Sequence, residues 1–161
     1  MRLSPRHQGW IYGSFALLFV SGALWLIYHY FIKVEGEFGV TVHPLEPVWL
    51  RFHGAGVMLF LFVLGTLLLS HMDKAWKLRR NLITGIAFVV VNLVLIVSGY
   101  LLYYFGGEEG RPIISLVHWI VGLGTGVLMG FHVWRGRVSR REVTHKRMHW
   151  RKPAVPPRKH P

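Results

Sequence analysis

Two histidines, His118 and His132, stand fourteen residues apart in an otherwise apolar run, HWIVGLGTGVLMGFH. In a helix, fourteen residues return to within ~40° of the starting direction and span ~21 Å, so both imidazoles face one side, near the two ends of the run. His53 and His71 are eighteen residues apart, about five full turns, and also share a face. A histidine inside a membrane is costly without a partner and marks a functional site. Neutral imidazole is a good axial ligand for haem iron, and two such ligands favour electron transfer over oxygen binding.

The histidines divide into two expected pairs. His53 and His118 each lie about five residues inside the outer end of an apolar block, so we expect them at matching depth as ligands of an outer haem. His132 requires a partner for an inner haem, and the spacing leaves two candidates. His71 is ~27 Å from His53, one turn more than the ~21 Å between His118 and His132. His7, just before the first block, is the competing partner. A single-haem protein would use only His53 and His118.

Four apolar blocks must position these histidines. The chain has 161 residues, of which 52% are hydrophobic. Each block holds about 20 or more mostly apolar residues, enough for a helix to cross a ~30 Å hydrocarbon layer. A soluble four-helix bundle would need polar outer faces, which these blocks lack. The sequence therefore predicts an all-α, four-transmembrane-helix bundle at 10–135, between basic tails at 1–9 and 136–161, with helices at about 10–32, 48–70, 82–105 and 113–134.

Charge placement predicts the topology. The formal net charge is +12, and sixteen of the nineteen Lys and Arg residues lie in the first tail, the 71–81 loop and the tail after Trp134. The positive-inside rule then places both termini in the cytoplasm of a bacterial inner-membrane protein. Topology accounts for this charge, so we expect no nucleic-acid partner. The chain has no cysteine, which excludes covalent C-x-x-C-H haem attachment and thiolate ligands.

Small and basic residues near the histidines are candidate cofactor contacts. Gly54, Gly122 and Gly126 would leave room for a flat macrocycle, although the four-residue spacing of the last two also suits helix packing. Arg51, close to His53, could pair with a haem propionate, and Arg111 is a second candidate.

The two halves of the chain form a weak repeat. Val20-Ser21-Gly22 and Val97-Ser98-Gly99 each precede a glycine-containing acidic outer loop and then a histidine-bearing block. The first outer loop, residues 33–47, is expected to be irregular. At its flanks, His29 is either an interfacial residue or part of a quinol or haem-edge site. His43 and Glu46 either belong to an ordinary loop or dock a partner or relay protons.

This pattern resembles the four-helix membrane b-type cytochromes, which include the cytochrome b subunits of formate dehydrogenases and nickel–iron hydrogenases and small quinol-oxidising di-haem cytochromes. The resemblance covers about residues 7–135 and rests on H-x13-H in the fourth block, His53 early in the second and His7 in PRHQGW. It implies two b haems, held by His53/His118 and His7/His132. His71 departs from the family pattern.

The resemblance also implies electron transfer between the quinone pool and a partner redox protein or larger respiratory complex, although no quinone signature is visible in the sequence. The rival hypothesis is a haem-free membrane anchor or assembly subunit of a larger complex. The basic C-terminal tail and the small loops of this chain would suit an anchor, whereas the paired histidines would not.

Overall fold

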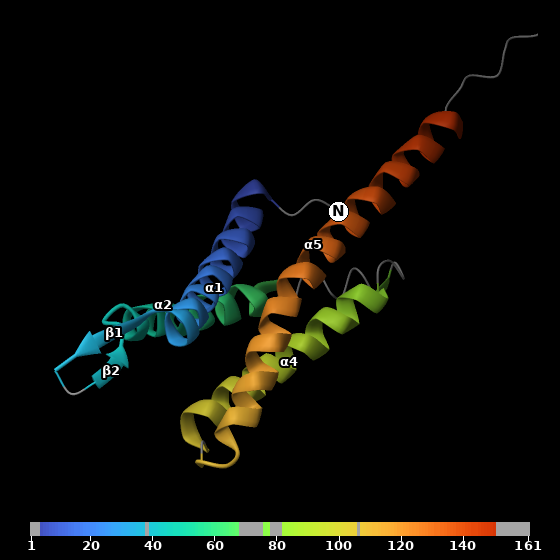
Figure 1. Cartoon of the computed structure of the whole chain (residues 1–161). Coiled ribbons are helices and arrows are strands. Elements are labelled where there is room, and N and C mark those ends of the chain that lie inside the picture. Colours follow the sequence, from blue (N-terminus) through green and yellow to red (C-terminus); the bar gives the residue numbers. More distant parts are fainter. Residues whose placement is uncertain (1–3, 38, 68–75, 78–81, 106, 151–161) are drawn as a thin grey trace, which may run out of the picture.

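The computed structural model describes residues 4–37, 39–67, 76–77, 82–105 and 107–150, with side chains described as far as residue 139. Its long elements are helices α1 (Pro5–Phe31), α2 (Glu46–Leu67), α4 (Leu82–Tyr104) and α5 (Arg111–Trp150). Two short strands, β1 (Lys33–Gly36) and β2 (Gly39–Val42), join α1 to α2. The predicted all-α class with four long helices is confirmed (Figure 1).

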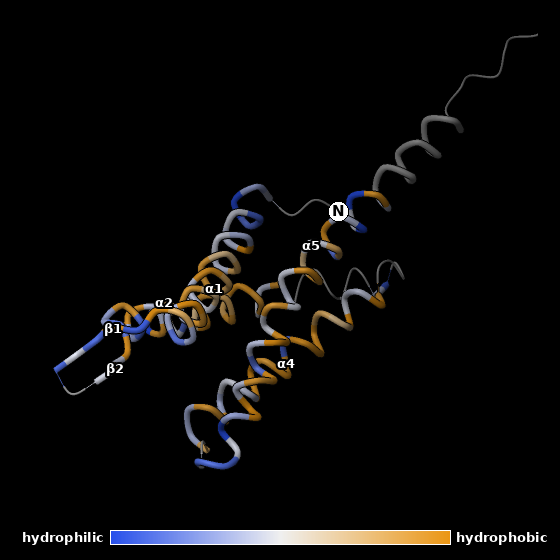
Figure 2. The backbone as a smooth tube through the Cα atoms, viewed as in Figure 1, coloured by the Kyte–Doolittle hydropathy of each residue, from blue (hydrophilic) through white to orange (hydrophobic). Residues whose placement is uncertain are grey.

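Each long helix has the length and composition of a membrane span. The candidate spans are Pro5–Phe31, Glu46–Leu67, Leu82–Tyr104 and Arg111–Ser139. Figure 2 shows apolar residues along the helices and polar residues at the β-hairpin and helix ends. Large apolar side chains such as Phe62, Ile83 and Val127 are three-quarters or more exposed. Lipid is the solvent that suits such a surface.

The buried positions are filled mainly by small polar residues. Ser14, Ser21, Asn92, Ser98 and Thr125 are all buried, and each bonds to a carbonyl of its own helix. Small side chains allow helix backbones to approach closely in a membrane, where burying apolar groups between helices brings little gain over lipid.

The helices form two antiparallel hairpins. α1 packs along α2, and α4 packs along α5 (Figure 1). The main contact between the hairpins is made by α1 and α5. Because α1 and α4 run in one direction and α2 and α5 in the other, the hairpins have matching directions, as the repeat predicts.

Two helix boundaries differ from the sequence expectation. α1 begins at Pro5 instead of residue 10, because Ser4 caps it: the Ser4 hydroxyl accepts from the His7 amide at 3.2 Å and Pro5 occupies the first turn. His7 therefore lies inside α1. The sequence predicts that the last helix ends at about residue 134, but α5 runs to Trp150. After Pro112 in the first turn, the next proline, which could end the helix, is Pro153. The basic tail is thus helical over its first half.

The loop expected to be irregular contains a β-hairpin. β1 and β2 pair antiparallel, with Lys33 opposite Val42 and Gly36 opposite Gly39. Gly39 has φ +109°, a conformation that side-chain-bearing residues rarely adopt. Most of the 71–81 loop lies outside the described residues, and so does His71.

Candidate functional site

His53 and His118 meet between the two hairpins. His53 is on α2 and His118 on α5, and their ring centres are 6.3 Å apart with the ring planes at 83°. Both side chains are half-buried. The structure therefore brings together the pair that the sequence ranked first.

His53 is held by α1. Its Nδ1 lies 3.0 Å from the carbonyl oxygen of Leu18. A carbonyl can only accept, so Nδ1 carries the proton and Nε2 has the lone pair. The ring packs on Gly22, where a Cβ would be 2.8 Å from Cε1 of His53. A side chain larger than hydrogen at Gly22 would displace the imidazole.

His118 is held in the same manner by α4. Its Nδ1 lies 2.8 Å from Oγ of Ser98. The Ser98 hydroxyl donates its one hydrogen to the Val94 carbonyl at 2.7 Å, so it accepts from the imidazole. Nε2 of His118 again has the lone pair. A Cβ at Gly99 would lie 3.3 Å from the ring.

The V-S-G repeat now has a physical explanation. In each hairpin its glycine makes room for the imidazole of the next helix. The serine differs between the halves. Ser98 bonds to His118 directly, whereas Ser21 bonds to the Leu17 and Leu18 carbonyls, and Leu18 itself holds His53. Sequence reasoning identified the motif but not these contacts.

A second level of histidines lies toward the other end of the bundle. His132 Nδ1 is 3.1 Å from Oγ1 of Thr84, and its ring stacks on Phe88 with centres 6.1 Å apart. His7 Nε2 is 3.2 Å from Oγ1 of Thr66. In each case a histidine of one helix bonds to a threonine of its hairpin partner. Thr66 and Thr84 were not identified from the sequence.

The depth of these contacts bears on the choice between His7 and His71. Thr66, which contacts His7, is thirteen residues beyond His53, or ~20 Å along α2. His132 is fourteen residues, or ~21 Å, beyond His118. His7 and His132 therefore lie at nearly equal depth, on the two helices that join the hairpins. A groove of about 430 Å³ borders His7 and Thr66 and is lined by Ser4 and residues of α1 and α2.

The glycines and arginines predicted to contact a cofactor lie in different environments. A Cβ at Gly54 would meet nothing within 4 Å, so open space lies beside it. Gly122 faces Leu95, and the place of a side chain at Gly126 is taken by the Phe19 ring, 2.7 Å from the Cβ position. Both are helix-packing contacts, which was the other expectation for this pair. Arg51 and Arg111 are exposed.

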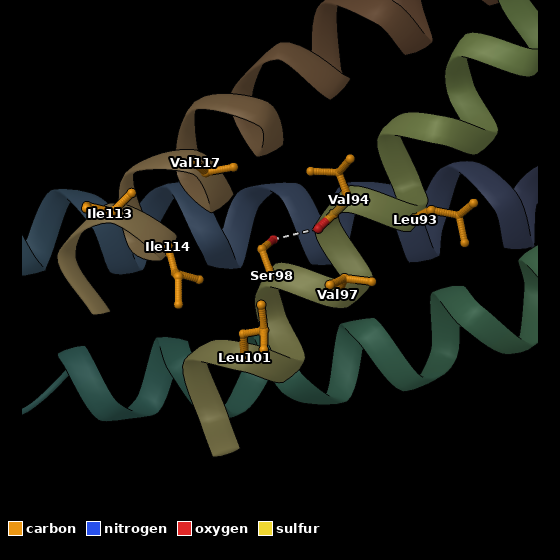
Figure 3. A pocket seen from close by; sticks show the side chains of 8 residues that line it. All are labelled: Leu93, Val94, Val97, Ser98, Leu101, Ile113, Ile114 and Val117. Atoms are coloured by element: carbon orange, nitrogen blue, oxygen red, sulfur yellow. Dashed lines mark hydrogen bonds between the residues drawn. The ribbon is translucent and has the colours of Figure 1, made fainter. Parts of the chain in front are cut away.

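An apolar groove of about 390 Å³ borders the site between α4 and α5. Its walls are aliphatic side chains of the two helices together with Ser98 (Figure 3). The dashed line in Figure 3 is the bond from Ser98 to the Val94 carbonyl. This groove would accept an apolar group next to the residue that orients His118.

The His53–His118 pair supplies two nitrogen ligands, so a metal held here would need further ligands from a cofactor or solvent. Among the described residues, no group of three or more His, Cys, Asp or Glu side chains converges. The ring centres of His53 and His118 are 6.3 Å apart, and each ring is held through Nδ1, which leaves Nε2 as the nitrogen that could bind a metal. Metal-bound histidines commonly donate their second ring nitrogen to a carbonyl or other acceptor, as both do here.

Comparisons of the chain with protein-family models, with curated proteins and with solved structures found no match. The functional assignment therefore depends on the site itself.

Proposed function

We propose that this chain is a b-type membrane cytochrome that binds haem between its two helical hairpins and transfers electrons within or across a bacterial cytoplasmic membrane. The main supporting observation is the His53–His118 pair, drawn from both hairpins with each Nδ1 proton engaged by the neighbouring helix. Each imidazole is thereby fixed in the tautomer whose Nε2 can bind iron.

The protein would hold the haem, orient the two imidazole rings and shield the haem from water. Leu18 and Ser98 set the tautomer and the rotation of the two rings, and Gly22 and Gly99 allow the rings to lie close to the backbone. Haem bound here would be held by His53 and His118 and would supply a one-electron Fe(III)/Fe(II) couple. The apolar surroundings limit water access, which is one determinant of reduction potential.

A second haem would lie at the His7–His132 level. Equal depth and the α1–α5 contact favour His7 over His71 as the partner of His132. His7 engages the Thr66 hydroxyl through Nε2, whereas His53 and His118 are held through Nδ1. Iron ligation through Nε2 would require the His7 ring to leave Thr66.

The charge distribution supports the proposed orientation. The C-terminal segment after Trp134, which holds ten of the nineteen Lys and Arg residues, would face the cytoplasm together with the 71–81 loop, and the β-hairpin would face outward. Electrons would then pass between the quinone pool and a partner redox protein or respiratory complex, as the family resemblance implies.

The test is spectroscopic. The chain, purified in detergent from haem-replete cells, should be red, and extraction should give about two b haems per chain. His118→Ala should remove about half of the haem if there are two sites and all of it if there is one. His43→Ala, at the β-hairpin end, is the control and should retain full haem. A colourless wild-type preparation from haem-replete cells would contradict the proposal.

One observation favours the haem-free anchor as a second candidate. α5 continues as helix to Trp150, beyond the apolar run that ends at about Trp134, and this extension is rich in Arg and Lys. A projecting basic helix suits docking to another subunit. In that case the purified chain would bind a partner without containing haem.

A further inference from the structure

Three residues of α2 form a stripe from the proposed haem ligand toward the β-hairpin. Glu46, Trp49 and His53 are spaced i, i+3, i+7, so they share one face of the helix. Glu46 lies seven residues, or ~10 Å, from His53 along that face. On α1, Trp25 and His29 continue the face that begins at Gly22.

Glu46 is a carboxylate held in a buried position. Glu46 is 8% exposed, and its Oε1 atom lies 2.7 Å from Nδ1 of His29. Trp25 stacks on the His29 ring at 4.6 Å between centres, with an interplanar angle of 16°. His29 therefore fixes the carboxylate through one oxygen, and Trp25 fixes His29.

Two polar atoms near the start of α2 are buried without a hydrogen-bond partner among the described residues. They are the second carboxylate oxygen of Glu46, Oε2, and the indole nitrogen of Trp49, Nε1. A buried group that lacks a partner costs about 1–3 kcal/mol, and more if it is charged, so such atoms call for a ligand. One is an acceptor, the other a donor, and their residues share a helix face.

Helix packing does not require this arrangement. When the two hairpins are aligned on their V-S-G motifs and central histidines, Gly106 and Arg111 take the places of His29 and Glu46. The second hairpin, α4 with α5, therefore lacks an equivalent of the His29–Glu46 contact, which is a feature of the first hairpin only.

We propose that Glu46 and Trp49 bind a hydroxyl group of a hydroquinone, with Glu46 as the proton acceptor. A phenolic hydroxyl can donate to Oε2 and accept from the indole N–H, and so satisfies both atoms. This inference rests on the proposed function, because His53 on the same stripe would hold the electron acceptor.

The reaction balances with the haems already proposed. Oxidation of one hydroquinone to quinone breaks two O–H bonds and releases two protons and two electrons. The two haems of the proposed function, held by His53/His118 and His7/His132, would each accept one electron. The proton of the bound hydroxyl passes to the Glu46 carboxylate, which lies next to His29, and 38% of the His29 side chain is accessible. The proton of the second hydroxyl passes to water.

The test separates binding from electron transfer. Binding of a short-chain hydroquinone to the full chain in detergent is measured anaerobically by calorimetry. Trp49→Phe keeps the ring and removes the donor, so the dissociation constant should rise about fivefold. Glu46→Gln keeps the shape and removes the charge, so it should raise the constant about tenfold or more. The matched controls, Trp134→Phe and Glu37→Gln, should bind as wild type does.

Stopped-flow kinetics test the proton-accepting role. Reduction of the bound haem by the hydroquinone should slow about 100-fold in Glu46→Gln, the order expected for loss of a general base. Reduction by dithionite should be unchanged, which shows that the haem site is intact.

Two outcomes would overturn the inference: wild-type hydroquinone affinity in both site variants, or no hydroquinone binding to wild type. Either would indicate that only water satisfies the two atoms. If the purified chain is colourless but its hydroquinone binding still depends on Glu46 and Trp49, the proposed haem function is wrong and the hydroquinone site is supported.

Discussion

The ring of Phe19 on α1 lies directly against the backbone of Gly126 on α5, at the place where the two hairpins touch. A Cβ at Gly126 would be 2.7 Å from Cε2 of Phe19, closer than real Cβ contacts. The distance between the hairpins therefore depends on the absence of a side chain at residue 126. That distance also sets the separation of His53 and His118.

We expect Gly126→Leu to push the hairpins apart. The overpacked contact should cost about 1–3 kcal/mol, lower the melting temperature in detergent and reduce the haem content. Gly130→Ala, one turn further along the same helix, is the control, because a Cβ there would meet nothing within 4 Å. Adding Phe19→Ala to Gly126→Leu should restore part of the loss. A Gly126→Leu chain as stable and as rich in haem as wild type would contradict the close contact.

Gly22→Ala should be more damaging than Gly99→Ala. The added methyl group would lie 2.8 Å from the His53 ring in the first case and 3.3 Å from the His118 ring in the second. His53 cannot retreat without losing its bond to Leu18. Haem content and the Soret spectrum measure the effect, and Gly85→Ala, with open space around it, is the control. Equal haem content in Gly22→Ala and Gly85→Ala would show that the His53 imidazole can bind haem from another position.

Ser98→Ala should weaken haem binding, whereas Ser21→Ala should not do so comparably. Ser98 accepts the Nδ1 proton of His118, and loss of such an orienting group typically reduces metal-site affinity 10–100-fold. Ser21 is the matched control because it is equally buried in the equivalent motif, yet the backbone carbonyl of Leu18 holds His53. Transfer of haem to apomyoglobin gives the relative dissociation rates. Similar rates for the two variants would argue against the asymmetry.

His7→Ala and His71→Ala should give different haem contents. Because His7 and His132 lie at nearly equal depth, His7→Ala should remove about one of two haems and His71→Ala should remove none. Pyridine haemochromogen assays of both variants measure this, with His132→Ala as the reference for loss of the inner haem. Loss of haem from His71→Ala alone would assign the inner ligand to His71 instead.

The long-range contacts of the site were harder to predict than its histidines. The repeat placed His53 and His118 at one depth, since equal positions in equivalent hairpins are necessarily level. It gave no means of finding Thr66 and Thr84, because a threonine in an apolar helix has no spacing signal of its own. Ser4 followed by Pro5 is a typical helix start, so the sequence contained the signal for the earlier start of α1, although residues 1–9 were predicted to be a basic tail.

Composition and periodicity by themselves determined that this chain makes four long apolar helices and which histidines share a helix face, because hydropathy and the helical repeat act locally along the chain. Only the tertiary structure decided that Leu18, Ser98 and Glu46 meet His53, His118 and His29. Those contacts join residues 17 to 35 positions apart, and their register depends on how small residues let two backbones approach. The same closeness, at Gly22, Gly99 and Gly126, brings the paired imidazoles to within 6.3 Å of each other.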